Sequence, residues 1–245
     1  MVERRVLAGI PCLIERPLGE VSGLALVYHG VTASKEGNLG IFTALVKSGV
    51  AIVLPDGAGH GERGEAALAP SVLGYRNFLW TCAARTALEA PALIDALSAL
   101  FPNVRLSAVG ISMGGYTAHL LALREKRVSN VVVISSGSLW DEPEVTLPLA
   151  RTFIEDHRPV QHARLAPPTR LLLLHGEDDP VFPMSDFEAT RAAYGAAYDE
   201  AGQGDRFAAR SFPGVGHYTA PAMRDHAIEF LLSPASRFPL PTSRL

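Results

Sequence analysis

The chain has 245 residues, of which 48% are hydrophobic and 19% are charged, and its formal net charge is -3. This length is sufficient for one large α/β domain, which we expect to span residues 1–245. The charges are nearly balanced and form no long basic run, so the composition does not indicate a nucleic-acid partner. The sequence contains no apolar run of about 18 residues, as a membrane span requires, and no signal peptide, so we expect a cytoplasmic protein.

The predicted elements alternate along the chain between strands and helices. Two closely spaced segments, near 3–8 and 10–16, predict an antiparallel hairpin at the N-terminus. Short runs rich in Val, Leu and Ile then predict strands that are buried on both faces, at 23–30, 49–57, 104–110, 130–137 and 169–179, with a shorter strand at 206–212. Helix-like segments lie at 39–49, 85–101, 116–126, 185–201 and 220–232. This alternation favours a doubly wound, mostly parallel sheet with helices on both faces.

Two segments depart from the alternation. Residues 138–168 contain Trp140, several prolines and no clear strand, so we interpret them as a small cap inserted on the substrate side. The tail, 233–245, is rich in Pro and Ser and is predicted to be extended and weakly packed. The two cysteines, Cys12 and Cys82, have no metal-ligand spacing and are expected to be buried thiols.

The stretch GISMGG at 110–115 follows a predicted strand and precedes a predicted helix. A tight reversal between the two crowds the backbone around Ser112, and Gly110 and Gly114 would relieve that crowding. This is the Gly-x-Ser-x-Gly pattern of a nucleophile elbow, in which the serine hydroxyl is lifted beyond the sheet. The alternative is a serine that serves only as a turn or helix-capping residue.

A serine nucleophile requires a base, and the base requires an orienting carboxylate. Asp179 lies in the stretch HGEDDPVFP, in a turn beyond the strand residues RLLLL. His217 lies in a glycine-bounded loop after the short strand at 206–212, in the stretch FPGVGHYTAP. The chain order Ser, Asp, His, each after a successive strand, is the order of the α/β-hydrolase triad.

These motifs resemble the α/β-hydrolase family, and more narrowly the small bacterial serine esterases related to dienelactone hydrolase. The matching stretches are HGVTASKE (29–36), DGAGHGER (56–63), GISMGG (110–115), HGEDDPVFP (175–183) and GVGHY (214–218). They extend over nearly the whole chain in the family's order. One departure matters, because dienelactone hydrolase itself uses a cysteine nucleophile where this chain has Ser112. The resemblance therefore implies esterase chemistry and not that enzyme's substrate.

The expected roles follow from the triad logic. Ser112 attacks the acyl carbon, His217 accepts and returns the proton, and Asp179 holds the imidazole. The resembling pattern, His-Gly-x-x-Asp followed by a hydrophobic-Pro pair, selects Asp179, with Asp178 as the alternative. No cofactor and no metal ion is expected.

The oxyanion of such a reaction needs two hydrogen-bond donors. The amide of Met113, at the helix N-terminus, is one. The resemblance implies that the residue after His-Gly supplies the other, which selects Val31, with Thr32 as the second choice. His29 and His175 each precede a glycine at a strand end and are expected to bond nearby backbone.

The loop DGAGHGERG at 56–64 permits two interpretations. His60 and Arg63 line the substrate pocket, or the loop is packed around an Asp56–Arg63 pair. Trp140, in the candidate cap, is expected to form a pocket wall.

The other candidates for the pocket wall are expected to lie in the core instead. These are Phe182, Met184 and Tyr218.

The sequence as a whole predicts a serine hydrolase that cleaves carboxylic esters of small or medium acyl chains through an acyl-enzyme. The alternatives are a thioesterase or peptidase with the same triad, since acyl transfer from oxygen, sulfur or nitrogen uses the same parts. A non-catalytic binding protein on the same fold is a third interpretation.

Overall fold

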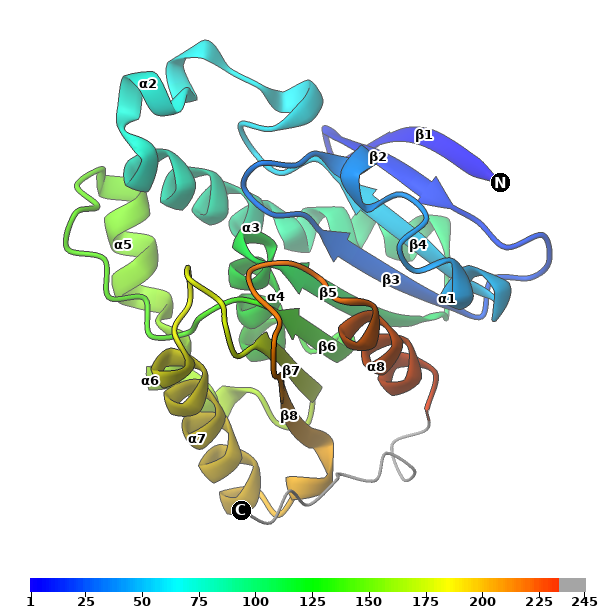
Figure 1. Ribbon diagram of the computed structural model, residues 1–245. Coiled ribbons are helices and arrows are strands. Elements are labelled where there is room, and N and C mark those ends of the chain that lie inside the picture. Colours follow the sequence, from blue (N-terminus) through cyan, green and yellow to red (C-terminus); the bar gives the residue numbers. More distant parts are fainter. Residues whose placement is uncertain (234–245) are drawn as a thin grey trace.

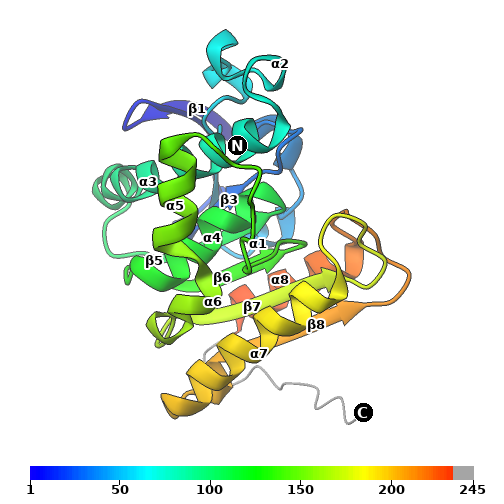
Figure 2. The same ribbon diagram turned by 90° about the vertical axis from the view of Figure 1, so that its left-hand side faces the viewer.

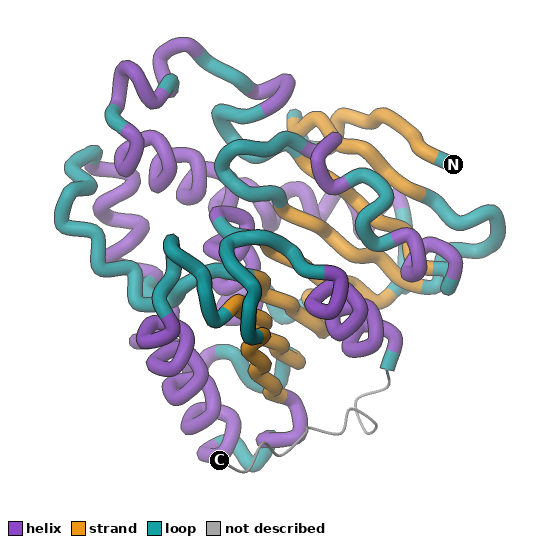
Figure 3. Tube along the Cα trace, viewed as in Figure 1, coloured by secondary structure: helices purple, strands orange, loops and turns teal. Residues whose placement is uncertain are grey.

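The computed structural model describes residues 1–233, and within them one eight-stranded sheet is flanked by helices on both faces (Figures 1 and 3). The strands are β1 (Val2–Leu7), β2 (Ile10–Glu15), β3 (Gly23–Tyr28), β4 (Val50–Pro55), β5 (Arg105–Ile111), β6 (Val128–Ile134), β7 (Arg170–Gly176) and β8 (Phe207–Phe212). The α-helices are α1 (Thr43–Lys47), α2 (Pro70–Leu73), α3 (Tyr75–Leu100), α4 (Met113–Arg124), α5 (Pro148–His157), α6 (Pro159–His162), α7 (Met184–Glu200) and α8 (Pro221–Leu232). Short 3-10 turns are η1 (Lys35–Asn38), η2 (Gly61–Arg63), η3 (Ala66–Leu68), η4 (Ala163–Leu165) and η5 (Gly204–Arg206).

The order of the strands across the sheet determines where a site can form. The order is β1-β2-β4-β3-β5-β6-β7-β8, and β2 is antiparallel to both β1 and β4, while the other neighbours are parallel. The chain moves outward from β3 to β4 in one direction and from β5 to β8 in the other. The carboxyl ends of β3 and β5 therefore meet at a topological switch point, where ligands bind in open α/β sheets. The predicted doubly wound sheet and its N-terminal hairpin are confirmed.

Both faces of the sheet are buried, which explains the continuous apolar runs. Val131 and Val133 of β6 pack in a core with α3, α4 and α7. Val132 and Ile134, which alternate with them, pack in a second core with α1 and α8. Figure 1 shows α1 and α8 in front of the strands and α3 and α4 behind them. Since side chains alternate between the faces of a strand, a strand covered on both faces is apolar at every position.

Two predicted helices differ from the structure in length. The helix expected at 85–101 begins ten residues earlier, at Tyr75. Within the added turns, residues 78–84 are all buried, so this stretch shows no amphipathic period from which a helix could be predicted. The helix expected at 39–49 is reduced to α1, five residues long, preceded by η1 and a turn.

A third core lies against α3 on the side of the sheet's carboxyl ends. It joins Trp80 of α3 and Tyr116 of α4 to Trp140 and to Phe153 of α5. Within 138–168 the chain forms α5, α6 and η4 and no strand, and Figures 1 and 2 show α5 alongside α3. The interpretation of this segment as a cap stays a prediction.

Three smaller expectations concern the thiols, the tail and membrane helices. Cys12 and Cys82 are both buried and free, as expected. Burial raises the pKa of each thiol to about 12. The prediction for the tail at 233–245 lies, apart from Ser233, outside the described part of the chain. Among residues 1–233 no helix combines the length and the apolar character that crossing a bilayer requires.

Candidate active site

Ser112 lies at the turn between β5 and α4, in a conformation that few residues adopt. Its backbone has φ 53° and ψ -117°, in a region that is strained for a residue with a side chain. The turn is held by the Ser112 N–H, which donates to the carbonyl of Ile134 at the end of β6 at 2.9 Å. Strain of this kind persists only where the surroundings impose it, and here it lifts the hydroxyl above the edge of the sheet.

The glycines around Ser112 are required by close backbone contacts. A Cβ on Gly110 would lie 2.3 Å from the carbonyl oxygen of Gly114, and a Cβ on Gly114 would lie 2.3 Å from that of Tyr28. Both distances are far inside van der Waals contact with backbone that cannot move aside. The packing of α4 against β3 and β5 thus excludes any side chain at these two positions, as the sequence predicts.

The structure brings Ser112, His217 and Asp179 together in one hydrogen-bonded line. The Ser112 Oγ lies 2.8 Å from His217 Nε2, and His217 Nδ1 lies 2.8 Å from Asp179 Oδ2. A carboxylate accepts only, so Nδ1 carries a proton and Nε2 is left to accept from the serine hydroxyl. This is the tautomer that a general base needs.

The neighbouring carboxylate, Asp178, lies outside this line. Its side chain is exposed, whereas that of Asp179 is fully buried. The other Asp179 oxygen, Oδ1, accepts from the amides of Val181 and Phe182 at 2.8 and 3.0 Å. Since the carboxylate is fixed by two amides, it can hold the His217 ring in one orientation.

The turn that follows β3 lies beside the serine. A Cβ on Gly30 would lie 3.4 Å from the Cβ of Ser112. Three residues that line this corner of the cavity are Val31, Thr32 and Met113. Within the described part of the chain, their backbone N–H groups have no protein acceptor. Unpaired donors next to a hydroxyl nucleophile are suited to a developing oxyanion.

A cavity of about 850 Å³ opens in front of Ser112 and His217. Its wall includes a group of aromatic rings, which are Trp80, Tyr116, Trp140 and Phe182. Tyr116 stacks on Trp80 with ring centroids 4.4 Å apart, and Trp140 contacts both rings edge-on. Trp140 therefore lines the cavity, where the sequence places it.

Phe182 lies in the wall of this cavity, although the sequence favours the core. Its ring packs between Tyr116 and His217, at 6.3 and 5.7 Å. Of the other two aromatic or sulfur candidates, Met184 packs against the core, while Tyr218 is exposed.

The prediction for the loop at 56–64 is wrong in both of its forms. His60 is buried and does not line the cavity, because each ring nitrogen contacts a backbone carbonyl instead. Arg63 pairs with Glu89 and donates to the backbone carbonyl of Asp56, not to its carboxylate. That carboxylate binds Lys35 Nζ at 2.6 Å, an ion pair that is buried on both sides.

His29 and His175 bond nearby backbone, as expected. His29 Nδ1 lies 2.8 Å from the Gly30 carbonyl and its Nε2 accepts from the Gly57 amide at 2.9 Å. His175 Nε2 lies 2.9 Å from the Phe182 carbonyl.

The site predicted from sequence lacks the charged residues of the cavity wall, which are Arg76, Asp141, Glu142 and Asp186. Arg76, at the start of α3, pairs with Glu142, in the loop before α5, at 3.2 Å. Burial raises the pKa of Glu142, and the neighbouring Arg76 and the indole of Trp80 oppose this rise. Neither Arg76 nor Glu142 lies in a motif. They meet only because α3 extends further toward its N-terminus than its sequence pattern indicates.

Serine hydrolases of the α/β-hydrolase superfamily carry a nucleophile on a turn of this kind, at this edge of a doubly wound sheet. The protein is a serine hydrolase of that superfamily. Residues 19–165 match the family described as "Serine aminopeptidase, S33", and because the match extends over more than half of the chain, the protein belongs to this family. The narrower resemblance to dienelactone hydrolase stays a prediction.

Several known proteins are similar to the chain, two of them over most of its length and one over about half. It is 28% identical over 256 aligned positions to esterase YjfP of Escherichia coli (strain K12), covering 94% of this chain and 97% of that protein. It is 31% identical over 121 positions to the putative esterase YitV of Bacillus subtilis (strain 168), covering 47% and 46% of the two. The solved structure of TT1662 from Thermus thermophilus superposes with a TM-score of 0.82 at 26% identity, covering 94% of this chain and 96% of that one.

Proposed function

We propose that the protein hydrolyses carboxylic esters of small or medium acyl chains, with Ser112 as nucleophile, His217 as general base and acid, and Asp179 as the orienting carboxylate. The observation that carries the proposal is the line of two 2.8 Å contacts from Ser112 Oγ through the imidazole to Asp179, at the mouth of a large cavity. Relatives that are named esterases support the choice of an oxygen ester.

The proposed reaction runs through an acyl-enzyme. Ser112 Oγ bonds to the acyl carbon while its proton passes to His217 Nε2, and the carbonyl oxygen becomes an oxyanion near the amides of Met113 and Val31. Collapse of this intermediate breaks the bond to the alcohol, which leaves with the proton from His217. A water molecule then attacks the acyl carbon with the same base, releasing the acid and restoring the serine.

The cavity supports an acyl group of apolar or aromatic character and has room for small and medium acyl chains. Pockets of roughly 300–1,000 Å³ hold ligands of drug-like size, and the one in front of Ser112 has about 850 Å³. Its aromatic wall offers flat apolar surface to the substrate. Two alternative reactions, cleavage of thioesters and of amides, would use the same catalytic residues, and the experiment below compares them with ester cleavage.

The test is covalent labelling combined with kinetics. We expect a fluorophosphonate to add one phosphonyl group to the wild type, measured by intact mass, and none to Ser112→Ala. Turnover of p-nitrophenyl acetate, butyrate and octanoate should fall by about 10⁴-fold or more in the variant. Ser98→Ala, at an exposed site of α3 away from the cavity, is the matched control and should keep both properties.

The acyl group is then held constant while the leaving atom changes. p-Nitrophenyl butyrate, S-(p-nitrophenyl) thiobutyrate and N-butyryl p-nitroaniline compare oxygen, sulfur and nitrogen with the same neutral aryl leaving group. A larger kcat/KM for the thioester or the anilide would replace the ester proposal. A folded wild type that neither labels nor hydrolyses any of these would favour the non-catalytic interpretation.

A further inference from the structure

His60 makes two short contacts to backbone oxygens and does not reach the substrate cavity. Its Nε2 lies 2.6 Å from the carbonyl of Val31, and its Nδ1 lies 2.8 Å from the carbonyl of Ala58. Carbonyl oxygens only accept, so a neutral ring donates to one of them and a protonated ring to both; Val31 is held in every form that carries a proton on Nε2. The ring is buried and packs between His29 and Phe78, with centroids 5.2 and 5.3 Å away.

The Val31 carbonyl belongs to the turn beside Ser112. In this turn the Ala33 N–H donates to the Gly30 carbonyl at 3.2 Å, so that Val31 and Thr32 occupy its two central positions. The peptide between them is the one whose orientation differs between turn types. His60 therefore bonds the peptide that is least restrained by the turn itself.

A trans peptide points its C=O and its N–H in opposite directions. With the Val31 carbonyl held toward His60, the Thr32 N–H points to the other side. The preceding peptide is held in the same manner, because His29 Nδ1 contacts the Gly30 carbonyl at 2.8 Å, which directs the Val31 N–H. Both amides lack a protein acceptor within residues 1–233, and both residues line the cavity.

The loop at 56–62, which carries His60, is also bonded to Lys35, at the other end of the segment 30–35 that contains the turn. Asp56 accepts from the Lys35 amide at 3.0 Å and from Lys35 Nζ at 2.6 Å, and it also accepts from the Glu62 amide at 3.0 Å. Its side chain is completely buried. The segments 30–35 and 56–62 are thus joined at two points, and His60 is the joint nearer the serine.

We propose that His60 is a positioning residue of the oxyanion hole: it donates from Nε2 to the Val31 carbonyl and so fixes the Val31–Thr32 peptide, which directs the Thr32 N–H itself and holds in place the turn that carries the Val31 N–H. This inference rests on the proposed function, since it assigns His60 a role in the same acyl transfer. His60 acts through the turn and does not touch the substrate.

Two substitutions separate the two contacts of the ring. The amide nitrogen of His60→Gln can occupy the place of Nε2 and keep the bond to Val31. The amide of His60→Asn reaches only the place of Nδ1, and so keeps the bond to Ala58 and loses that to Val31. We expect kcat for p-nitrophenyl butyrate to fall about 10- to 100-fold in His60→Asn, with little change in KM, and to be largely retained in His60→Gln.

A second readout follows transition-state binding directly. A trifluoromethyl ketone forms a hemiketal whose oxyanion occupies the oxyanion hole, so its inhibition constant should rise in His60→Asn in proportion to the loss of kcat/KM. Equal activity of the two variants and the wild type would overturn the proposal. So would equal losses in both variants that follow their losses of thermal stability, because these would indicate a purely structural histidine.

A third measurement needs no variant and so does not depend on whether the variants fold. The ¹⁵N spectrum of the wild-type ring should show Nε2 protonated, and an unprotonated Nε2 would overturn the proposal. Fluorophosphonate labelling of the wild type separates this failure from failure of the proposed function. A wild type that labels while His60→Asn keeps full activity rejects only the positioning role, whereas one that neither labels nor hydrolyses rejects both.

Discussion

At Gly114 the backbone of β3 leaves no room for a methyl group. A Cβ there would lie 2.3 Å from the Tyr28 carbonyl oxygen and 2.8 Å from the Tyr28 Cβ. Gly114→Ala must therefore push α4 away from the sheet, and α4 begins directly after Ser112. We expect a loss of about 3 kcal/mol in the free energy of unfolding, measured by urea denaturation, because overpacking against backbone is poorly relieved.

The same displacement should disturb the serine. We expect kcat/KM of Gly114→Ala for p-nitrophenyl butyrate to fall by at least about 100-fold, since misplacement of the order of 1 Å has effects of this size. Gly19→Ala is the control, because nothing lies within 4 Å of a Cβ at that position. A Gly114→Ala protein with wild-type stability would show that α4 is not packed against β3 as described.

At the scale of elements, α4 and α7 meet through a buried pair of polar rings. His119 of α4 stacks on Tyr194 of α7, and His119 Nδ1 lies 3.0 Å from the tyrosine hydroxyl. Burial lowers the pKa of His119 from 6.5 to about 3. The folded state therefore keeps the ring neutral, whereas the unfolded chain takes up a proton below pH 6.5.

The sign of the pH dependence follows from this difference. Because the pKa of His119 is lowered on folding, its contribution is present above pH 6.5 and is lost as the pH falls toward 3. Between pH 7 and pH 5 this group alone should remove about 2 kcal/mol of stability. Urea denaturation at pH 7 and pH 5 gives the free energy of unfolding at each pH. The decrease between the two pH values should be about 2 kcal/mol smaller in His119→Gln than in the wild type. Tyr194→Phe, which keeps the histidine buried, should retain the wild-type pH dependence.

The elements that could be predicted from sequence are those whose pattern reflects a local environment. The run at 130–137 reads as a strand because β6 is covered on both faces and ends in a turn. The first ten residues of α3 escaped prediction because Phe78, Leu79 and Trp80 pack in a core formed by a distant part of the chain. An apolar run that is buried on all sides carries no period from which to distinguish helix from strand.

In the candidate site, too, some residues could be predicted from sequence and others could not. Ser112, Asp179 and His217 could be placed in one site because each follows a parallel strand, and the carboxyl ends of such strands share one edge of the sheet. The contacts of His60 could not, because its buried ring is surrounded by the turn at 30–33 and by α3. Neither neighbour can be assigned from the sequence around His60.

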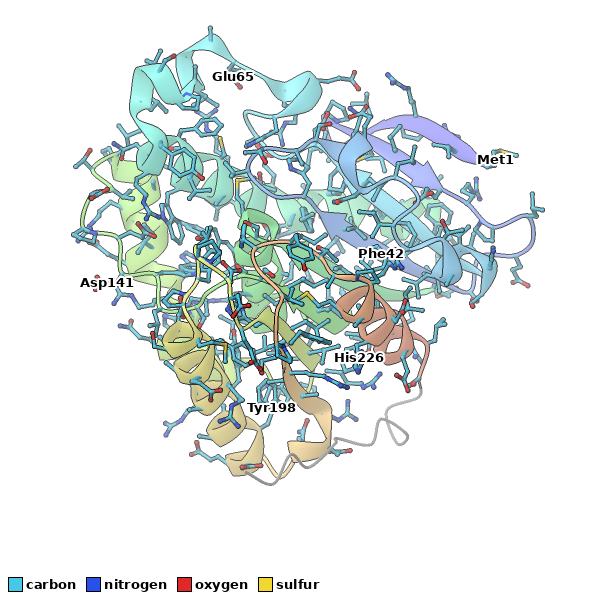
Figure 4. The ribbon with its side chains drawn as sticks, viewed as in Figure 1. Met1, Phe42, Glu65, Asp141, Tyr198 and His226 are labelled. Carbon is cyan, nitrogen blue, oxygen red and sulfur yellow. The ribbon has the colours of Figure 1, made fainter. Side chains whose placement is uncertain are left out.

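At the scale of the whole molecule, the charges of the cavity wall are unequal. Among the described residues that line it, the carboxylates are Asp141, Glu142 and Asp186, and the cation is Arg76. Asp141 lies on the exposed loop between β6 and α5 (Figure 4), and the formal net charge of the chain has the same sign, at -3. An excess of charges of one sign around a cleft attracts or repels charged substrates over several ångströms.

An ester that carries its own carboxylate should therefore be a poor substrate. We expect kcat/KM for mono-p-nitrophenyl succinate to be about 5- to 10-fold lower than for p-nitrophenyl butyrate, as repulsion of about 1 kcal/mol near a partly hydrated surface implies. Raising the ionic strength from 0.01 to 1 M should shrink this ratio, because the Debye length falls from about 30 to about 3 Å. Asp141→Asn should also reduce the difference in kcat/KM between the two esters, without changing turnover of the neutral ester. A ratio that neither salt nor Asp141→Asn alters would mean that shape, and not the negative field of the cavity, sets the preference.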